Sequence, residues 1–179
     1  MAGVSKWMLS KQLTLTEDKT DCLVVGRTYD VRRLDISSFL INDMTITVKK
    51  SVKNLGVTVD CNLMFKDQVN NVVKNAGYHL RNIAFLKKYL DEKTLRMLPH
   101  NHVTSRLDYC NSLYYRLPNY LLKRLQLVMN RAARLIKGLS LRDRITPALI
   151  QLHWLPVKAR IVFKICVMTY QAINCGKPG

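Results

Sequence analysis

The chain has 179 residues, of which 48% are hydrophobic, enough for one domain or two small ones with a real core. Its 29 Lys and Arg outnumber its 12 Asp and Glu, which gives a formal net charge of +17. The lack of a long apolar run and of a signal-peptide pattern argues against a membrane or secreted protein, and predicts a soluble intracellular one in nucleus or cytoplasm.

The positive charge is concentrated in the second part of the chain. Residues 1–62 contain 9 Lys or Arg and 7 Asp or Glu, whereas residues 63–179 contain 20 and 5. A field of this sign attracts polyanions, so we expect nucleic acid as the partner rather than an anionic membrane. The alternative is a basic surface that serves only solubility.

The scattered cysteines form no Cys-x-x-Cys pair, and no histidines stand at zinc-finger spacing. We therefore expect reduced thiols, no metal site and no cofactor. Glycine-rich phosphate loops, a nucleophile elbow and an Asp-Asp pair between apolar residues are also missing from the sequence. No residue is nominated as catalytic.

Residues 1–62 are predicted to form a small antiparallel β domain. Its expected first elements are the end of a helix at Ser5–Lys11, a buried strand at Cys22–Val25 and a polar connection at Arg27–Leu40. Met44–Val48 and Leu55–Val59 then alternate apolar with polar residues, which predicts the two strands of one hairpin.

Residues 63–179 are predicted to be all helical, which makes the fold class α+β, mainly α. A long amphipathic helix follows Phe65, and Pro99 should kink or stop the next one. Thr146 and Pro147 should start a short helix as N-cap and first-turn residue. Val157–Asn174 is apolar nearly all round in its middle, so we expect it at the centre of a helical bundle.

The clearest helix begins at Pro118 and should end at Gly138. Its apolar residues form one seam, and five cations lie away from that seam: Lys123, Arg124, Arg131, Arg134 and Lys137. No Asp or Glu occurs between Tyr109 and Leu141. We therefore predict that this face follows a sugar-phosphate backbone, although any surface helix can carry solvated cations.

Five phrases, in order, carry a family resemblance. They are WMLSKQLTLTEDKTD from Trp7, VKNLGVTVD from Val52, SRLDYCNSL from Ser105, RLQLVMNRAAR from Arg124 and LHWLPV from Leu152. Together they resemble the C-terminal part of the reverse transcriptase of non-LTR (LINE-type, jockey-like) retrotransposons.

That resemblance implies the end of a polymerase palm at residues 1–62 and a thumb within residues 63–179. It implies that Lys19 stands near the phosphates of the incoming nucleotide, and that Leu55, Gly56 and Val57 belong to a hairpin that grips the primer. The family binds Mg²⁺ at catalytic aspartates, which would lie before residue 1. We therefore expect no polymerase activity from this chain alone.

The sequence thus leads to two functional hypotheses. The first is a fragment of an RNA-directed DNA polymerase that retains sequence-independent binding of RNA or DNA template–primer. The alternative is a helical protein-interaction module, or a decayed reading frame with no selected function.

Overall fold

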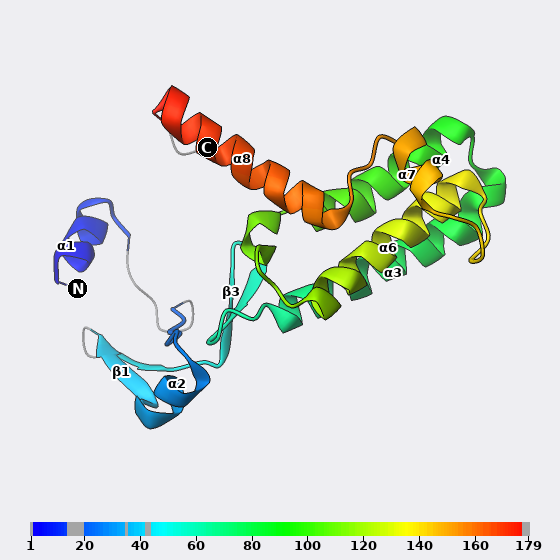
Figure 1. Ribbon diagram of the computed structural model, residues 1–179. Coiled ribbons are helices and arrows are strands. Elements are labelled where there is room, and N and C mark those ends of the chain that lie inside the picture. The colour runs from blue at the N-terminus through cyan, green and yellow to red at the C-terminus, as the bar shows by residue number, and fades with distance from the viewer. Residues whose placement is uncertain (1, 14–19, 35, 42–43, 177–179) are drawn as a thin grey trace. The chain divides into compact units, whose positions relative to one another are not determined.

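The computed structural model describes residues 2–13, 20–34, 36–41 and 44–176 (Figure 1). It is mainly helical with two small antiparallel sheets, which confirms the α+β, mainly α, fold class. The chain divides into two compact units, Met1–Phe65 and Lys66–Gly179, whereas the sequence suggested a boundary after residue 62.

The first unit contains two hairpins where the sequence predicted one. Its elements are the helices α1 (Ala2–Ser10) and α2 (Thr28–Leu34) and the strands β1 (Ser38–Ile41), β2 (Met44–Thr47), β3 (Ser51–Asn54) and β4 (Val57–Asp60). β1 pairs with β2, and β3 pairs with β4. The predicted pairing of Met44–Val48 with Leu55–Val59 is therefore wrong.

A two-residue turn explains this difference. Leu55 and Gly56 both have positive φ, 45° and 84°, as the tight turns of short hairpins require. This turn pairs Asn54 directly with Val57, so the partner of β4 is β3, which lies in the basic stretch just before the turn. β2 pairs instead with β1, which begins inside the stretch Arg27–Leu40 that was predicted as a polar connection.

Cys22–Val25 is not the buried strand that the sequence predicted. Only Cys22 forms a bridge, to Val48, and the side chain of Val25 is half exposed. The backbone is held at the end of this segment, where the Gly26 amide donates to the Cys61 carbonyl at 3.0 Å. The apolar run is thus too weakly covered to serve as a central strand.

All of the regular secondary structure assigned to the described residues of the second unit is helical. Its elements are α3 (Lys66–Leu86), η2 (Lys87–Tyr89), α4 (Glu92–Pro99), the π-helical turn η3 (His100–Thr104), α5 (Ser105–Asp108), η4 (Asn111–Tyr114), α6 (Asn119–Lys137), α7 (Thr146–Gln151) and α8 (Val157–Cys175). Pro99 was expected to kink or stop this helix. The helix does not stop there: Pro99 and His100 keep helical backbone angles, and the π-helical turn η3 joins α4 to α5. Ile145, and not Thr146, is the N-cap of α7.

The core of this unit lies between α3 and α6, which run side by side (Figure 1). Val69, Ala76, Leu121 and Leu125 are fully buried there, so the apolar stripe of each helix covers the other. Gly138 ends α6 in the left-handed conformation, with φ 67°, which confirms its predicted capping role. Because the apolar stripe of α6 packs on α3, this packing also determines the direction in which the cationic side of α6 faces.

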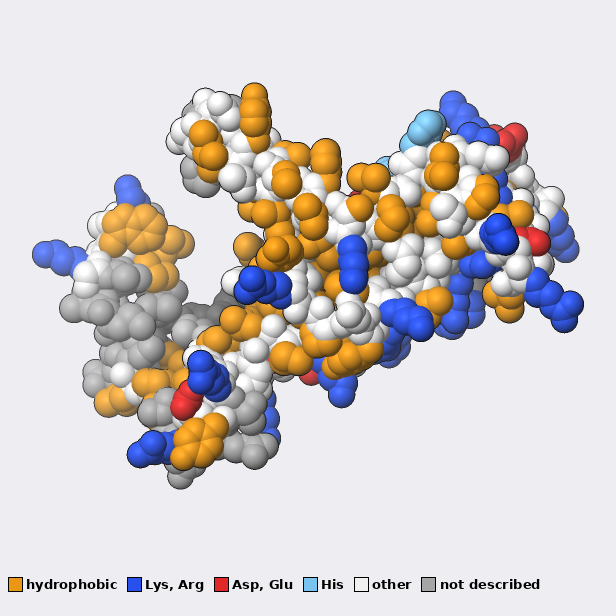
Figure 2. All heavy atoms as spheres, viewed as in Figure 1, with side chains coloured by type: hydrophobic (Ala, Val, Ile, Leu, Met, Phe, Trp, Pro, Cys, Tyr) orange, Lys and Arg blue, Asp and Glu red, His pale blue; other side chains and the backbone are white. Residues whose placement is uncertain are grey.

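The prediction that α8 is central to the bundle is wrong. Only its first turns are covered, with Val157 4% and Ile161 3% exposed, whereas Phe163 is 60% and Ile173 75% exposed. Figure 2 shows hydrophobic side chains along the remainder of the helix. An all-round apolar sequence makes a helix suited to burial, but the described helices of the second unit cover only the N-terminal end of α8.

Candidate nucleic-acid interface

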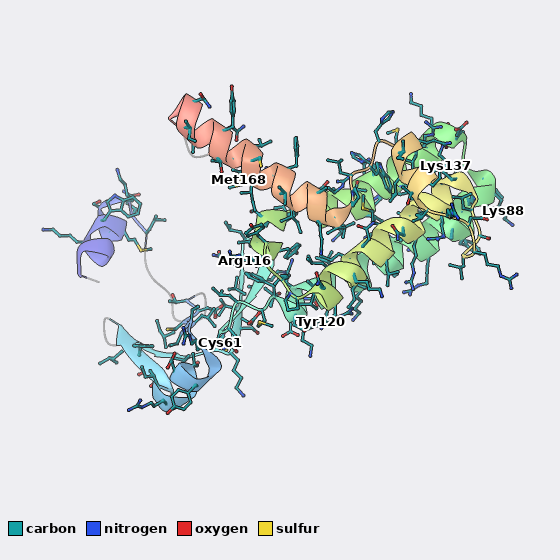
Figure 3. The ribbon with its side chains drawn as sticks, viewed as in Figure 1. Cys61, Lys88, Arg116, Tyr120, Lys137 and Met168 are labelled. Atoms are coloured by element: carbon teal, nitrogen blue, oxygen red, sulfur yellow. The ribbon has the colours of Figure 1, made fainter. Side chains whose placement is uncertain are left out.

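The five cations nominated from the sequence all lie on α6, but the fold gives them different neighbours. Lys123 and Arg131 are exposed, while Arg124, Arg134 and Lys137 are partly buried. Lys137 is the last residue of α6 (Figure 3). The exposed cations can contact a ligand, whereas a partly buried cation can also stabilise the fold.

Arg124 and Arg134 have structural partners. The Arg124 guanidinium donates to Oδ1 of Asn70 on α3. Arg134 donates to the Ser140 carbonyl at 3.0 Å and to the Asp143 carbonyl at 3.1 Å, which holds the loop that follows α6 against the helix end. Replacing either arginine would therefore disturb local structure as well as charge.

A groove lies between the C-terminal halves of α3 and α6, with a volume of about 560 Å³. Four cations line this α3–α6 groove: Arg81, Lys87, Arg131 and Arg134. None of its described lining residues is acidic, and aliphatic side chains such as Leu80 and Leu135 form part of its wall. In Figure 2, Lys and Arg side chains line the edge formed by α3 and α6.

One of these cations, Lys87, lies close to Gly138 at the end of α6. A Cβ placed on Gly138 would lie 3.7 Å from Nζ of Lys87, so the ammonium group sits directly beside the glycine that ends the helix. Lys87 thus spans from the end of α3 to the end of α6. The groove combines charge from two segments that are distant in the sequence.

Sequence reasoning missed Arg81 and Lys87, although a signal was present. The stretch Gln68–Leu90 contains no Asp or Glu, just as Tyr109–Leu141 does not. Two acid-free segments that form neighbouring helices produce a joint positive potential in the groove between them. Which helices become neighbours, however, is decided by the fold.

Lys123 does not line the α3–α6 groove. It lines a different depression, together with residues of α7 and the start of α8. The sequence grouped Lys123 with Arg131 because both lie away from the apolar seam. In the structure these two residues lie on flanks of α6 that face different helices.

The remaining nominated residues belong to the first unit of the chain, not to the helical unit that contains this groove. Leu55 and Gly56 form the β3–β4 turn, with Leu55 84% exposed, and Val57 is buried at the start of β4. Lys19, nominated as a phosphate contact, lies outside the described residues. The primer-grip and phosphate-contact assignments stay predictions.

Five of the six tyrosines interleaved with the cations of the helical unit are exposed: Tyr78, Tyr89, Tyr109, Tyr115 and Tyr120. Tyr114 is the exception, at 1% exposed, and its hydroxyl accepts from Nε2 of Gln68 at 3.5 Å. Burial raises the pKa of Tyr114, which keeps this phenol neutral. Rings beside cations, such as Tyr89 under the Lys88 ammonium at 4.8 Å, are suited to stack on bases.

Two histidines lie together beside the core. His79 of α3 stacks on His102 of η3, with ring centroids 4.7 Å apart, and Arg106 lies 3.4 Å from Nε2 of His79. Burial lowers the pKa of His79, and the positive charges of His102 and Arg106 lower it further. Among the described residues, no group of three or more His, Cys, Asp or Glu is placed to hold a metal ion.

Comparisons with known proteins supply no family for this chain: no family model, no curated protein and no solved structure matches it. In the parts of the chain that the structure describes, no helix has the length and apolar character needed to cross a membrane.

Proposed function

We propose that this protein binds nucleic acid without sequence preference, and that the α3–α6 groove is the contact surface. The supporting observation is the set of four cations, Arg81, Lys87, Arg131 and Arg134, around a groove whose described lining residues include no acid. Phosphate contacts of this kind supply affinity and register but do not read bases. The resemblance to retrotransposon reverse transcriptases supports the same proposal, with template–primer as the ligand.

The test is the salt dependence of binding to a mixed-sequence DNA duplex, measured by fluorescence anisotropy, with an RNA–DNA hybrid in parallel. The groove variant combines Arg81→Gln, Lys87→Gln and Arg131→Gln. Arg124 and Arg134 are left intact because they hold Asn70 and the loop after α6. The logarithmic salt slope falls by about 0.9 for each phosphate that is no longer neutralised, so the variant slope is about 2.7 smaller in magnitude.

A matched control removes the same charge elsewhere, through Lys6→Gln, Lys93→Gln and Lys164→Gln. All of these lysines are exposed and lie outside the groove. The control should keep a slope close to that of the wild type. Equal slopes for the groove and control variants, with both folded by circular dichroism, would show that binding depends only on net charge.

We further propose that the chain acts as a binding protein and does not polymerise DNA by itself. Polymerases position two metal ions with converging carboxylates, and the resemblance assigns no residue of this chain to those aspartates. Primer extension by the purified chain, with Mg²⁺ and all four nucleotides, should give no product above a no-protein control. Template-dependent extension would overturn this part of the proposal.

A further inference from the structure

A second depression lies on the other flank of α6, between this helix and the start of α8. It consists of two adjoining cavities of about 490 and 280 Å³, one reaching α7 and the other reaching the segment before α6. Both are lined by Asn119, Leu122 and Lys158, so they form one continuous depression, the α6–α8 furrow. Its described lining residues include none from α3.

The floor of the furrow is apolar. Leu122 and Leu149 are 8% and 7% exposed, and Ile161 is 3% exposed, so these side chains pack into the core while one surface of each faces the furrow. Val162, half exposed, extends this apolar surface along α8. Large aliphatic or aromatic side chains of a ligand would be buried favourably on such a floor.

The rim of the furrow is positive. Lys123, Lys158 and Arg116 are exposed lining residues, and none of the described lining residues is acidic. Arg116, from the segment before α6, lines the same cavity as Lys158 and Ile161 of α8. Neither α6 nor α8 has an acidic residue in its first turn, so the positive ends of both helix dipoles add to this potential.

Side-chain amides hold the furrow in shape. The Gln126 Oε1 accepts from the Val157 backbone amide at 2.8 Å, which fixes the start of α8 against α6. The Gln126 Nε2 donates in turn to Oδ1 of Asn130 at 2.8 Å. Arg160 pairs with Asp108 on α5 and anchors the same end of α8. The furrow is therefore preorganised, which reduces the entropic cost of binding.

We propose that the α6–α8 furrow binds an acidic peptide segment of a partner protein, with large apolar side chains interspersed among Asp and Glu. Charge complementarity selects the acidic residues, through Lys123, Lys158 and Arg116, and the floor selects the apolar ones. Three cations spread over two adjoining cavities, against four around the α3–α6 groove, leave more apolar surface per charge in the furrow, which favours a ligand that carries apolar as well as acidic side chains. This inference does not depend on nucleic-acid binding in the α3–α6 groove.

The test selects a displayed library of random 12-residue peptides against the immobilised full chain at 0.15 M salt. Selected peptides are synthesised with a fluorescent label, and their affinity for the chain is measured by anisotropy. We expect them to combine acidic with large apolar residues. Replacing either the acidic residues by their amides or the apolar residues by Ser should weaken binding at least tenfold.

Two furrow variants locate the site. Lys123→Glu with Lys158→Glu reverses the rim charge, and Val162→Asp places a charge in the apolar surface at a half-exposed position. Each should weaken binding at least tenfold. Lys93→Glu with Lys164→Glu, exposed residues outside the furrow, is the charge-matched control and should bind nearly as tightly as the wild type.

The proposal is overturned if the selected peptides lack either class of residue, or if the furrow and control variants bind them equally well. It is also overturned if a single-stranded oligonucleotide displaces the peptide and its own binding is abolished in both furrow variants, because nucleic acid would then be the occupant. The α3–α6 groove variant should retain peptide binding. Failure of that variant to bind the peptide would place the site elsewhere.

Discussion

Gly138, at the end of α6, offers a sharp test of the local structure beside the α3–α6 groove. It has φ 67° and ψ 26°, and its amide donates to the Arg134 carbonyl. Placing an L-residue in this left-handed region costs roughly 1–2 kcal/mol. The new Cβ of Gly138→Ala would lie 3.7 Å from Nζ of Lys87, an ordinary van der Waals contact, so no steric clash is added. Backbone strain is thus the whole cost.

Gly77 provides the matched control, because substitution by Ala there should change the free energy of unfolding in the opposite direction. It lies inside α3, and a Cβ would meet nothing within 4 Å. Ala is favoured over Gly in a helix interior by about 1 kcal/mol. Gly77→Ala should therefore raise the free energy of unfolding by up to that amount, while Gly138→Ala lowers it by about 1–2 kcal/mol. Gly138→Asn should fall in between, since Asn tolerates the left-handed region.

Urea unfolding followed by helical circular dichroism measures these differences. With a denaturant dependence of about 2 kcal/mol/M, the midpoints of the two alanine variants should be separated by about 1 M. An unfolding midpoint of Gly138→Ala at or above the wild type would refute the left-handed end of α6. A lower unfolding midpoint for Gly77→Ala would contradict the open space found around Gly77.

Three further predictions concern the core, a turn and pH. Leu125→Ala, at a fully buried position, should lower the free energy of unfolding by about 2–5 kcal/mol, whereas Leu127→Ala, half exposed on the same helix, should cost far less in the same urea titration. Leu55→Asn should raise the melting temperature of the protein slightly, because Asn-Gly suits a turn with two positive φ angles; a lower melting temperature would contradict that turn. Because burial lowers the pKa of His79 in the folded state, its contribution to stability is present above the unfolded pKa of about 6.5 and is lost as pH falls through the folded pKa. His79→Gln should therefore reduce the loss of stability in urea titrations between about pH 7 and pH 5, and an unchanged pH profile would contradict this assignment.

Several local features could be predicted because they depend only on residues close in sequence. Pro99 lacks an amide proton, and the regular α-helical pattern gives way to a π-helical turn directly after it. Gly138 accepts a positive φ, and α6 ends there. The apolar residues of α6 recur at spacings of three and four, and the same residues face the core. The cations of α6 therefore had to lie off the core.

Other features could not be predicted, because they depend on which segments meet. β4 pairs with β3 because a two-residue turn at Leu55 and Gly56 joins them, although β2 has an equally suitable alternating pattern. The apolar length of α8 is exposed because the described helices of its unit cover only its start. The spacing of apolar residues in the sequence shows how much of a helix surface is apolar. It does not show whether another element covers that surface.

The sequence by itself determined the helical character of residues after Phe65, the end of α6 at Gly138, and the excess of positive charge in the second part of the chain. Only the tertiary structure decided where that charge acts. Packing of α3 against α6 places Arg81 and Lys87 beside Arg131 in one groove, while Lys123 joins Lys158 in another. The physical reason is that composition sets the total charge, whereas long-range packing sets the distances between charges, and the potential depends on those distances.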